Sequence, residues 1–335
     1  MSLATLILAA LVPTTASAGF ESTCSFDEGS ARVDITSVGS DGLARNGDSI
    51  ELLSTDCGEA TVHNTDLIVV TIAETSGRNG FALFLRPKGR FAPGATDEGP
   101  GSEIEIEVHF TDRSDETLGV YTGTGGQRIA IDGQDIDLDA DEATPEPDVL
   151  VSGLDDCEPD VSGCDILDVR SGEGRDRIDQ RTHDEGTIVF LLAESGDDQI
   201  QAQSSILART FADGGDGDDE MRTNANASMG GGPGADLLVG GAGADGELYG
   251  DGGADQVFGR GGTDTLVAGS GRDVLVGGLG ADSLAGRRGG DRIWGGRGHD
   301  ELSGDEGYDR CEPEPGRTLQ EQGCEERLRL PPPSP

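Results

Sequence analysis

The sequence predicts an all-β protein with a right-handed parallel β-roll, a form of β-solenoid, in its C-terminal half and a β-rich region before it. Three observations predict this fold. A nine-residue unit rich in glycine and aspartate recurs from Gly214 onward, an aliphatic residue keeps its phase within that unit, and upstream segments alternate between apolar and polar residues. A flexible glycine-rich linker has no reason to keep aliphatic residues in phase.

The composition leaves little material for a thick hydrophobic core. The 335 residues include 55 Gly but only nine Phe, three Tyr and one Trp, and the formal net charge is -41. Glycine raises the entropy cost of folding, so something besides hydrophobic burial must stabilise the fold. Because this charge repels nucleic acid and anionic membranes and attracts cations, we expect metal ions as ligands and no nucleic-acid partner. No basic patch is apparent along the sequence.

Residues 1–18 have the pattern of a secretory signal peptide. An apolar run from Leu3 to Val12 is followed by the small residues Ala16, Ser17 and Ala18. The run lacks the usual basic segment before it, and it is too short to span a membrane. We therefore expect a secreted, extracellular protein without a membrane span.

Six cysteines fit an oxidising destination, since their number is even and their spacing matches no zinc site. Spacing alone leaves other pairings and free thiols open. We prefer local pairs, because each then closes a short segment beside a change in sequence character: Cys24 with Cys57, Cys157 with Cys164, and Cys311 with Cys324.

The region 19–150 is predicted to be β structure throughout. The clearest strand runs from Glu103 to Phe110, where apolar residues alternate with Glu and His. Further strands are expected at 31–35, 67–72, 81–85, 127–131 and 148–151. Strand spacing alone fits either a continuation of the solenoid or a small separate sandwich.

Residues 151–213 are predicted to be degenerate repeats. A Gly-x-Asp-x-apolar kernel appears around Asp176 and again around Asp198, before the regular run begins. We therefore favour one continuous solenoid that becomes regular along the chain.

The regular unit, Gly-Gly-x-Gly-x-Asp-x-apolar-x, fills residues 214–310. From Asp255 onward the sixth-position aspartates are nine residues apart, and a 17-residue step precedes Asp236. The aspartates stand at Asp219, Asp236, Asp245, Asp255, Asp264, Asp273, Asp282, Asp291, Asp300 and Asp309. The inward apolar residues are expected to be Met221, Leu238, Val257, Leu266, Leu275, Leu284, Ile293 and Leu302.

Each position of the unit suits calcium. Glycines permit positive φ and let a turn expose its carbonyl oxygens, while the aspartate adds an anionic oxygen. Calcium takes about six to eight oxygen ligands, whereas magnesium demands stricter geometry. Since two repeats make one coil, ions are expected in rows along both edges of the roll. The predicted metal ligands are Asp219, Asp236, Asp245, Asp255, Asp264, Asp273, Asp282, Asp291 and Asp300, with Gly231, Gly232, Gly234, Gly259, Gly261, Gly277, Gly278, Gly280, Gly295, Gly296 and Gly298.

Over residues 214–309 the sequence resembles the RTX, or haemolysin-type calcium-binding, repeat family, with degenerate matches back to about 171. The resemblance implies several Ca²⁺ ions as cofactors and a parallel β-roll that folds when calcium binds. Relatives exported by a one-step route carry a C-terminal secretion signal. This chain instead has an N-terminal signal pattern and a proline-rich tail.

Departures from the unit predict weak or empty sites. An inserted Gly246 moves the apolar residue to Leu248, Asp251 replaces a second-position glycine, and Arg287 with Arg288 brings positive charge to an ion edge. Cys311 stands where the last apolar residue belongs, so its bridge would cap the roll at the start of the tail 311–335.

Other sites find less support. The acidic spacing of an EF-hand loop occurs at Asp135, Asp137, Asp139, Asp141 and Glu146. Ala140 stands where that loop needs glycine, so a solvated acidic edge is favoured. No His-Glu-x-x-His, Gly-x-Ser-x-Gly or phosphate-binding loop is present, and the four histidines are scattered.

The sequence therefore predicts a secreted, non-enzymatic, calcium-binding structural or adhesive module, with a cell-surface or polysaccharide ligand as a further partner. The alternatives are a secreted polysaccharide-acting enzyme or a toxin, each carrying the repeats as a stability and folding device.

Overall fold

The computed structural model describes residues 22–38, 40–46, 49–52, 55–61, 67–73, 79–84, 105–110, 116–121, 128–132, 135–137, 149–152, 166–182, 188–203, 209–224, 227–312 and 320–327. These residues form strands and turns and no helix. No helix among them is therefore long and apolar enough to cross a bilayer. The chain divides into an N-terminal unit, residues 1–173 with 182–190, and a second unit, residues 174–181 with 191–335.

The N-terminal unit contains two sheets. In spatial order, the first holds β1 (Thr23–Asp27), β2 (Arg32–Val38), β6 (Leu67–Ala73), β8 (Glu105–Phe110), β12 (Val149–Ser152), β11 (Asp135–Asp137) and β10 (Arg128–Asp132). The second holds β13 (Ile166–Arg170), β9 (Glu116–Tyr121), β7 (Asn79–Phe84), β3 (Ser40–Asn46), β4 (Ser49–Leu52) and β5 (Thr55–Thr61).

The chain of this unit winds from one sheet to the other. Strands β2, β6, β8 and β12 pair in parallel in the first sheet, and β3, β7, β9 and β13 pair in parallel in the second. Antiparallel pairs are confined to β1 with β2, the run β3-β4-β5, and the run β10-β11-β12. Within the described residues the unit is thus itself solenoid-like, because parallel neighbours require crossovers between the sheets.

The strands predicted in the N-terminal region are confirmed within a few residues of their expected bounds. The alternation of the strand β8 is also confirmed where its side chains are described, since Ile106 and Val108 are buried. The Cys24–Cys57 disulfide is confirmed. The predicted Cys157–Cys164 pair and the signal peptide lie outside the described residues.

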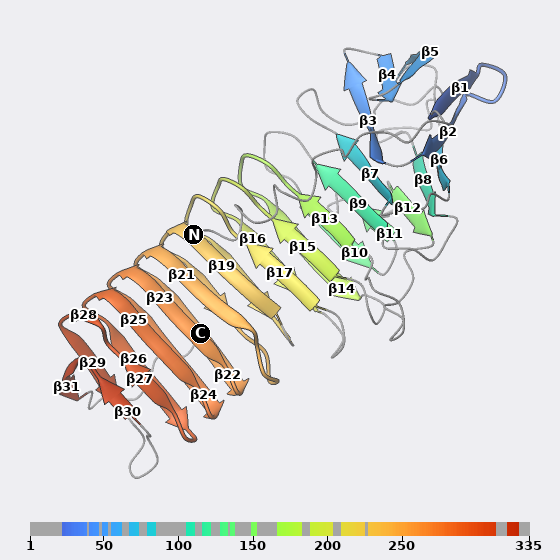
Figure 1. Cartoon of the computed structure of the whole chain (residues 1–335). Helices are drawn as coiled ribbons and strands as arrows, with labels where there is room; N and C mark the ends of the chain where they lie inside the picture. Colours follow the sequence, from blue (N-terminus) through green and yellow to red (C-terminus); the bar gives the residue numbers. More distant parts are fainter. Residues whose placement is uncertain are drawn as a thin grey trace. The chain divides into compact units, whose positions relative to one another are not determined.

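The second unit, here called the roll, also contains two sheets (Figure 1). Sheet A holds, in order, β14 (Arg177–Thr182), β16 (Gln199–Ala202), β18 (Glu220–Thr223), β20 (Leu237–Val239), β22 (Gln256–Gly262), β24 (Val274–Gly280), β26 (Arg292–Arg297), β29 (Asp309–Glu312) and β31 (Cys324–Arg327). Sheet B holds β17 (Arg209–Asp213), β19 (Ala227–Gly234), β21 (Glu247–Gly253), β23 (Thr265–Gly271), β25 (Ser283–Gly289), β27 (Glu301–Ser303) and β30 (Gln320–Gln322), with β28 (Glu306–Gly307) paired to β25. Strand β15 (Ile188–Leu192) is divided between the two units.

Repeats two apart pair in parallel, as predicted. Leu266 of β23 is in register with Leu284 of β25, and Leu275 of β24 is in register with Ile293 of β26. Each coil of the roll therefore consists of two repeats, one in each sheet, and the C-terminal region is a β-solenoid of about seven turns.

The core of the roll is a double file of apolar side chains. Every residue predicted to point inward is at most 1 % exposed. The shift caused by Gly246 is confirmed as well, because Leu248 is fully buried and aligns with Leu266. At the end of the roll Cys311 is fully buried and is bonded to Cys324, which confirms the predicted cap.

Candidate metal centre

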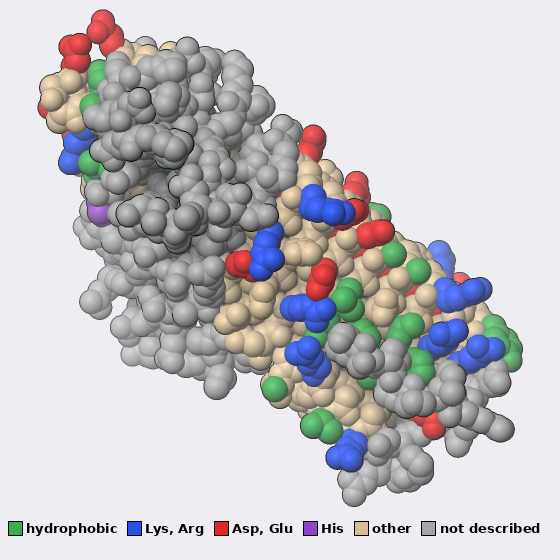
Figure 2. All heavy atoms as spheres, turned by 180° about the vertical axis from the view of Figure 1, so that it is seen from behind, with side chains coloured by type: hydrophobic (Ala, Val, Ile, Leu, Met, Phe, Trp, Pro, Cys, Tyr) green, Lys and Arg blue, Asp and Glu red, His purple; other side chains and the backbone are tan. Residues whose placement is uncertain are grey.

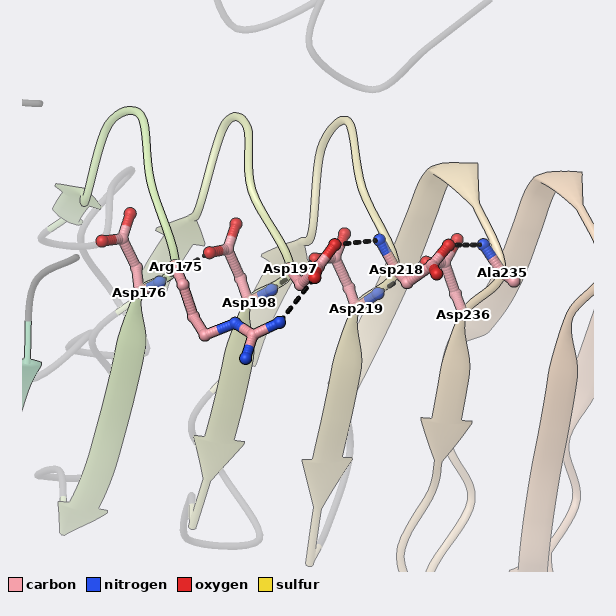
Figure 3. A network of polar contacts seen from close by, with 8 residues as sticks. All are labelled: Arg175, Asp176, Asp197, Asp198, Asp218, Asp219, Ala235 and Asp236. Atoms are coloured by element: carbon pink, nitrogen blue, oxygen red, sulfur yellow. Dashed lines mark hydrogen bonds and ion pairs between the residues drawn. The ribbon is translucent and has the colours of Figure 1, made fainter. Parts of the chain in front are cut away.

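Two rows of buried aspartates follow the roll, each aspartate standing just before a strand. Row A precedes sheet A and consists of Asp176, Asp198, Asp219, Asp236, Asp255, Asp273, Asp291 and Asp309. Row B precedes sheet B and consists of Asp245, Asp264, Asp282 and Asp300. No member of either row is more than 6 % exposed. Figure 3 shows the first four members of row A stacked on successive coils.

Each row is a ladder of hydrogen bonds between coils. The N–H of Asp255 donates to Oδ1 of Asp273 over 2.9 Å, and in row B the N–H of Asp264 donates to Oδ1 of Asp282 over 3.0 Å. The main-chain carbonyl is also used at most of these aspartates: that of Asp273 accepts from the N–H of Arg292 over 2.9 Å. At such an aspartate, three polar atoms hold neighbouring coils together.

The fourth polar atom is left over. A buried carboxylate oxygen has no hydrogen-bond partner at Asp198, Asp219, Asp236, Asp245, Asp255, Asp264, Asp273, Asp282, Asp291 and Asp309. That oxygen is Oδ2 in every case except Asp245, where it is Oδ1. A buried carboxylate oxygen without a donor or cation is costly, so these atoms indicate a ligand that is positive.

Burial raises the pKa of these carboxyl groups. The pKa rises to about 7 at Asp198, Asp236, Asp255, Asp264 and Asp291, and to about 6 at Asp219 and Asp282. The main cause of the raised pKa is desolvation by burial. The backbone N–H that donates to Oδ1 lowers the pKa, and the negative charges of neighbouring aspartates in the row raise it further. A row of ionised carboxylates is therefore unfavourable unless cations balance it.

Backbone carbonyls lie close to the leftover oxygens. A Cβ placed on Gly277, the first residue of its repeat, would lie 2.6 Å from Oδ2 of Asp282 and 2.6 Å from the carbonyl oxygen of Gly295 on the next coil. At Gly286 the corresponding distances are 2.5 Å to Oδ2 of Asp291 and 2.9 Å to the carbonyl of Gly304. In these two repeats a carboxylate and a carbonyl oxygen crowd the same side of the first-position Cα, which favours glycine there, although Ala268 takes this place in the repeat of Asp273.

The fourth-position glycine allows the coils to approach each other. Gly280 has φ +141°, and a Cβ there would collide with the carbonyl oxygen of Gly262 on the previous coil. The predicted Gly261 plays no such part, because its nearest neighbours would be 3.6 Å from an added Cβ. In that repeat the fourth position is Gly262, with φ +126°.

Second-position residues adopt positive φ whether or not they are glycine. Asp251, Arg260 and Arg287 have φ of 67°, 68° and 73°. The loss of glycine at this position, predicted to weaken a site, leaves the turn in the same left-handed conformation.

No group of three or more His, Cys, Asp or Glu side chains that suits a metal ion occurs in the described residues. The oxygen donors that the structure places beside the rows are the aspartate carboxylates and the backbone carbonyls. Carboxylate and carbonyl oxygens are the donors that calcium prefers.

A family model described as "RTX calcium-binding nonapeptide repeat (4 copies)" matches residues 230–266, 247–275 and 276–311. Residues 230–311 consist of RTX calcium-binding repeats. Comparisons with curated proteins and with solved structures found no match. The RTX repeats thus contain Asp236 to Asp309, whereas Asp176, Asp198 and Asp219 continue row A upstream of the matched segment.

The structure places all the aspartates predicted as ligands in the two rows, and it adds three residues to row A. Asp176, Asp198 and Asp309 make the same ladder hydrogen bonds as the predicted set. The sequence signal for Asp176 and Asp198 was the Gly-x-Asp kernel, and the signal for Asp309 was its position nine residues after Asp300. Row A ends at Glu325, whose Oε2 accepts from the N–H of Asp309 over 2.6 Å. Glu325 stands outside the RTX repeats, so no repeat signal marks it.

The predicted glycines fall at distinct positions of the repeats. Gly231, Gly259, Gly277 and Gly295 are first-position, Gly232, Gly278 and Gly296 second-position, and Gly234, Gly280 and Gly298 fourth-position residues. Row B begins only at Asp245. In the described part of the roll upstream of Asp245, the buried row aspartates therefore lie along one edge alone.

Fifth-position aspartates form a short outer row. Asp218 Oδ1 accepts from the N–H of Ala235 over 2.8 Å, and Asp197 pairs with Arg175 at 2.6 Å (Figure 3). The hydrogen bond from Arg175 is the main cause that lowers the pKa of Asp197. These exposed, partnered carboxylates contrast with the buried rows. Of the EF-hand pattern, Asp135 and Asp137 lie on β11, and its other members lie outside the described residues.

Proposed function

We propose that this chain is a secreted, non-enzymatic protein that folds on calcium binding and serves as an extracellular structural or adhesive module. The observation that carries the proposal is the file of buried, partnerless carboxylate oxygens in rows A and B. Bound calcium supplies the positive charge that these oxygens lack. The aspartates of adjacent coils, together with first-position carbonyls, are the residues that would hold it.

Coupling between binding and folding follows from where the charges lie. Each row forms only when the coils stack, and stacking brings the aspartates together in a buried environment. Without cations, the same contacts that build the roll concentrate negative charge. We infer that the roll opens when calcium is removed and closes when it is restored.

A calcium titration of the whole chain tests this. Far-ultraviolet circular dichroism should gain β signal as calcium is added, calorimetry should report several bound ions, and excess chelator should reverse both. Magnesium at equal concentration should restore much less β structure. Equal β content in calcium and in chelator would contradict the proposal.

The extracellular part of the proposal is supported by the Cys24–Cys57 and Cys311–Cys324 disulfides, which persist in oxidising compartments. Expression of the full chain in a bacterium that exports proteins checks it. The processed product should appear outside the cytoplasm with Gly19 as its first residue. A product retained in the cytoplasm with residues 1–18 intact would contradict secretion by this signal.

The non-enzymatic part is tested separately. The calcium-loaded chain should release no new ends from anionic or neutral polysaccharides, with calcium held constant. Release that scales with protein concentration would favour the enzyme alternative.

A further inference from the structure

The roll contains a surface whose charge is opposite to that of the whole chain. Between residues 256 and 300 the only acidic residues are the row members Asp264, Asp273, Asp282, Asp291 and Asp300. All five are at most 2 % exposed. The same segment holds six arginines, and each is exposed: Arg260, Arg272, Arg287, Arg288, Arg292 and Arg297. Its exterior is therefore cationic, although its formal charge is close to zero.

This result corrects the expectation that the chain has no basic patch. Counting charges along the sequence includes aspartates that the fold turns inward. When calcium balances those aspartates, the outer surface of residues 256–300 shows only arginine among its strongly charged side chains. On the face drawn in Figure 2, blue arginine side chains lie along the roll, and red acidic side chains occur among them.

Most of these arginines lack an acidic partner. Arg287 and Arg288 pair with Asp305 and Glu306 of the next coil, at 3.7 Å and 3.3 Å. Arg260, Arg272, Arg292 and Arg297 make no ion pair with any residue that the structure describes. Four guanidinium groups are thus available to an external anion.

Upstream in the roll the arrangement is different. Arg175, Arg177 and Arg222 each pair with a carboxylate of the roll, Asp197, Asp179 and Glu220. Their separations are 2.6 to 2.8 Å. Unpaired arginines are therefore a feature of the regular coils and not of the roll as a whole.

The available arginines lie within three neighbouring coils. Arg260 is on β22 and Arg297 is on β26, the next strand but one in sheet A. Neighbouring strands are about 4.8 Å apart, so the two residues stand about 10 Å apart along the roll axis. Arg292 lies at the start of β26, and Arg272 lies close to Gly290 just before that strand. A ligand with repeated anionic groups suits this distribution better than a single small anion.

We propose that the surface formed by Arg260, Arg272, Arg292 and Arg297 binds an anionic polysaccharide through its carboxylate groups. A guanidinium group offers paired N–H donors that match a carboxylate. The inference rests on the proposed function, because the surface exists only in the folded, calcium-loaded roll.

Other polyanions fit less well. Single-stranded nucleic acid is bound by stacking bases on exposed aromatic rings, but the two aromatic residues of this segment, Phe258 and Trp294, are 2 % and 6 % exposed. Membrane binding needs an apolar face beside the basic residues, and Leu279 is the only large exposed apolar residue of the segment.

The test compares two triple variants of the full chain in saturating calcium. Carboxymethyl dextran is the probe and uncharged dextran is the control polymer, with binding measured by calorimetry at about 0.1 M salt. Arg260→Gln with Arg292→Gln and Arg297→Gln should weaken binding to carboxymethyl dextran at least tenfold. Arg175→Gln with Arg177→Gln and Arg222→Gln removes the same charge from paired positions and should change it less than twofold.

Several outcomes would overturn the proposal. These are no binding by the parent chain, equal loss in both variants, binding to dextran as strong as to its carboxymethyl form, or stronger binding to duplex DNA or anionic vesicles. Circular dichroism and calcium titration accompany each measurement. If the parent chain does not fold with calcium, the proposed function fails; if it folds and binds calcium but not the polymer, only this inference fails.

Discussion

The main-chain N–H of Asp273 donates a 2.9 Å hydrogen bond to Oδ1 of Asp291, one coil further along the roll. The second oxygen of both carboxylates, Oδ2, is buried without a hydrogen-bond partner. The two oxygens of one carboxylate therefore have different roles. Oδ1 accepts the hydrogen bond that joins neighbouring coils, and Oδ2 is a negative oxygen that could bind a calcium ion. The predictions below separate these two roles.

Replacing Asp273 by asparagine should separate them most directly. The amide oxygen still accepts from the N–H of Asp255, but an amide nitrogen replaces Oδ2. The calcium-loaded roll should lose about 1–3 kcal/mol of unfolding free energy. The β content that remains in excess chelator should not fall further, because a buried charge is removed. Urea unfolding in calcium measures the first quantity, and circular dichroism in chelator measures the second.

The matched control is Asp251→Asn, at an exposed position with φ 67° that asparagine tolerates. It should change the unfolding free energy in calcium by no more than about 0.5 kcal/mol and leave the signal in chelator unchanged. An unchanged unfolding free energy for Asp273→Asn in calcium would show that Oδ2 of Asp273 holds no cation.

Stability without calcium should fall as the pH rises. The ordinary pKa of an aspartate is 3.8, and burial raises that of Asp255 and Asp291 to about 7 in the folded roll. Between about pH 4 and pH 7 the folded state therefore holds more protons than the unfolded state, so each increase in pH favours unfolding. Circular dichroism in excess chelator should show the folded fraction of the roll falling across pH 5–7.

Saturating calcium should remove the decline, because binding displaces the protons, and calcium affinity should rise with pH over the same window. Calcium-free stability that increases between pH 5 and pH 7 is incompatible with raised pKa values in the rows.

Substitution of Gly280 by alanine should disrupt coil stacking. The residue has φ +141° and its new Cβ would meet the carbonyl oxygen of Gly262. We expect a loss of more than about 2 kcal/mol in the calcium-loaded state. Gly261→Ala, where the nearest atoms are 3.6 Å from the added Cβ, is the control and should be nearly neutral. Similar losses for both variants would mean that the glycines act through chain entropy alone.

Removal of the terminal disulfide should loosen the last coil first. Cys311→Ala with Cys324→Ala opens a link between residues 13 apart and should cost about 3 kcal/mol. Hydrogen exchange should accelerate at β29 and β31 before it does so at β22. Cys24→Ala with Cys57→Ala removes a disulfide from the N-terminal unit and should leave exchange in the roll unchanged. Uniform acceleration along the roll in the first variant would argue against a local cap.

The regular part of the roll was predictable because its period is strict. From Asp255 to Asp300 the nine-residue recurrence keeps an aliphatic residue two positions after each aspartate, as in Asp264 and Leu266, which fixes one as a turn residue and the other as an inward residue. Six strands of the N-terminal region were predicted from alternation and turn residues, whereas β1, β3, β4, β5 and β9 were not. Which strands pair in parallel was not predictable, because alternation records only which face is buried and not the neighbouring strand.

Other features depend on contacts that the sequence does not encode locally. Asp176 and Asp198 belong to row A although they are 22 residues apart in the sequence, because β14 and β16 pair in register. Glu325 ends the row from outside the repeats. The cationic exterior was missed because a charge count does not distinguish Asp264, which is buried, from Arg260, which is exposed.

The alternation of repeats between two sheets also limits how the roll can change in length. Each repeat pairs with the repeat two places away, so adding or deleting eighteen residues inside the regular segment would preserve every partner on both edges. Adding or deleting nine would transfer all following strands to the opposite sheet. Cys311 and Cys324 would move together, because β29 and β31 both follow the change, so the disulfide would close the roll from the other layer. Length variants that differ by whole coils should therefore keep the present strand partners, whereas half-coil variants should exchange the two edges of the roll beyond the point of change.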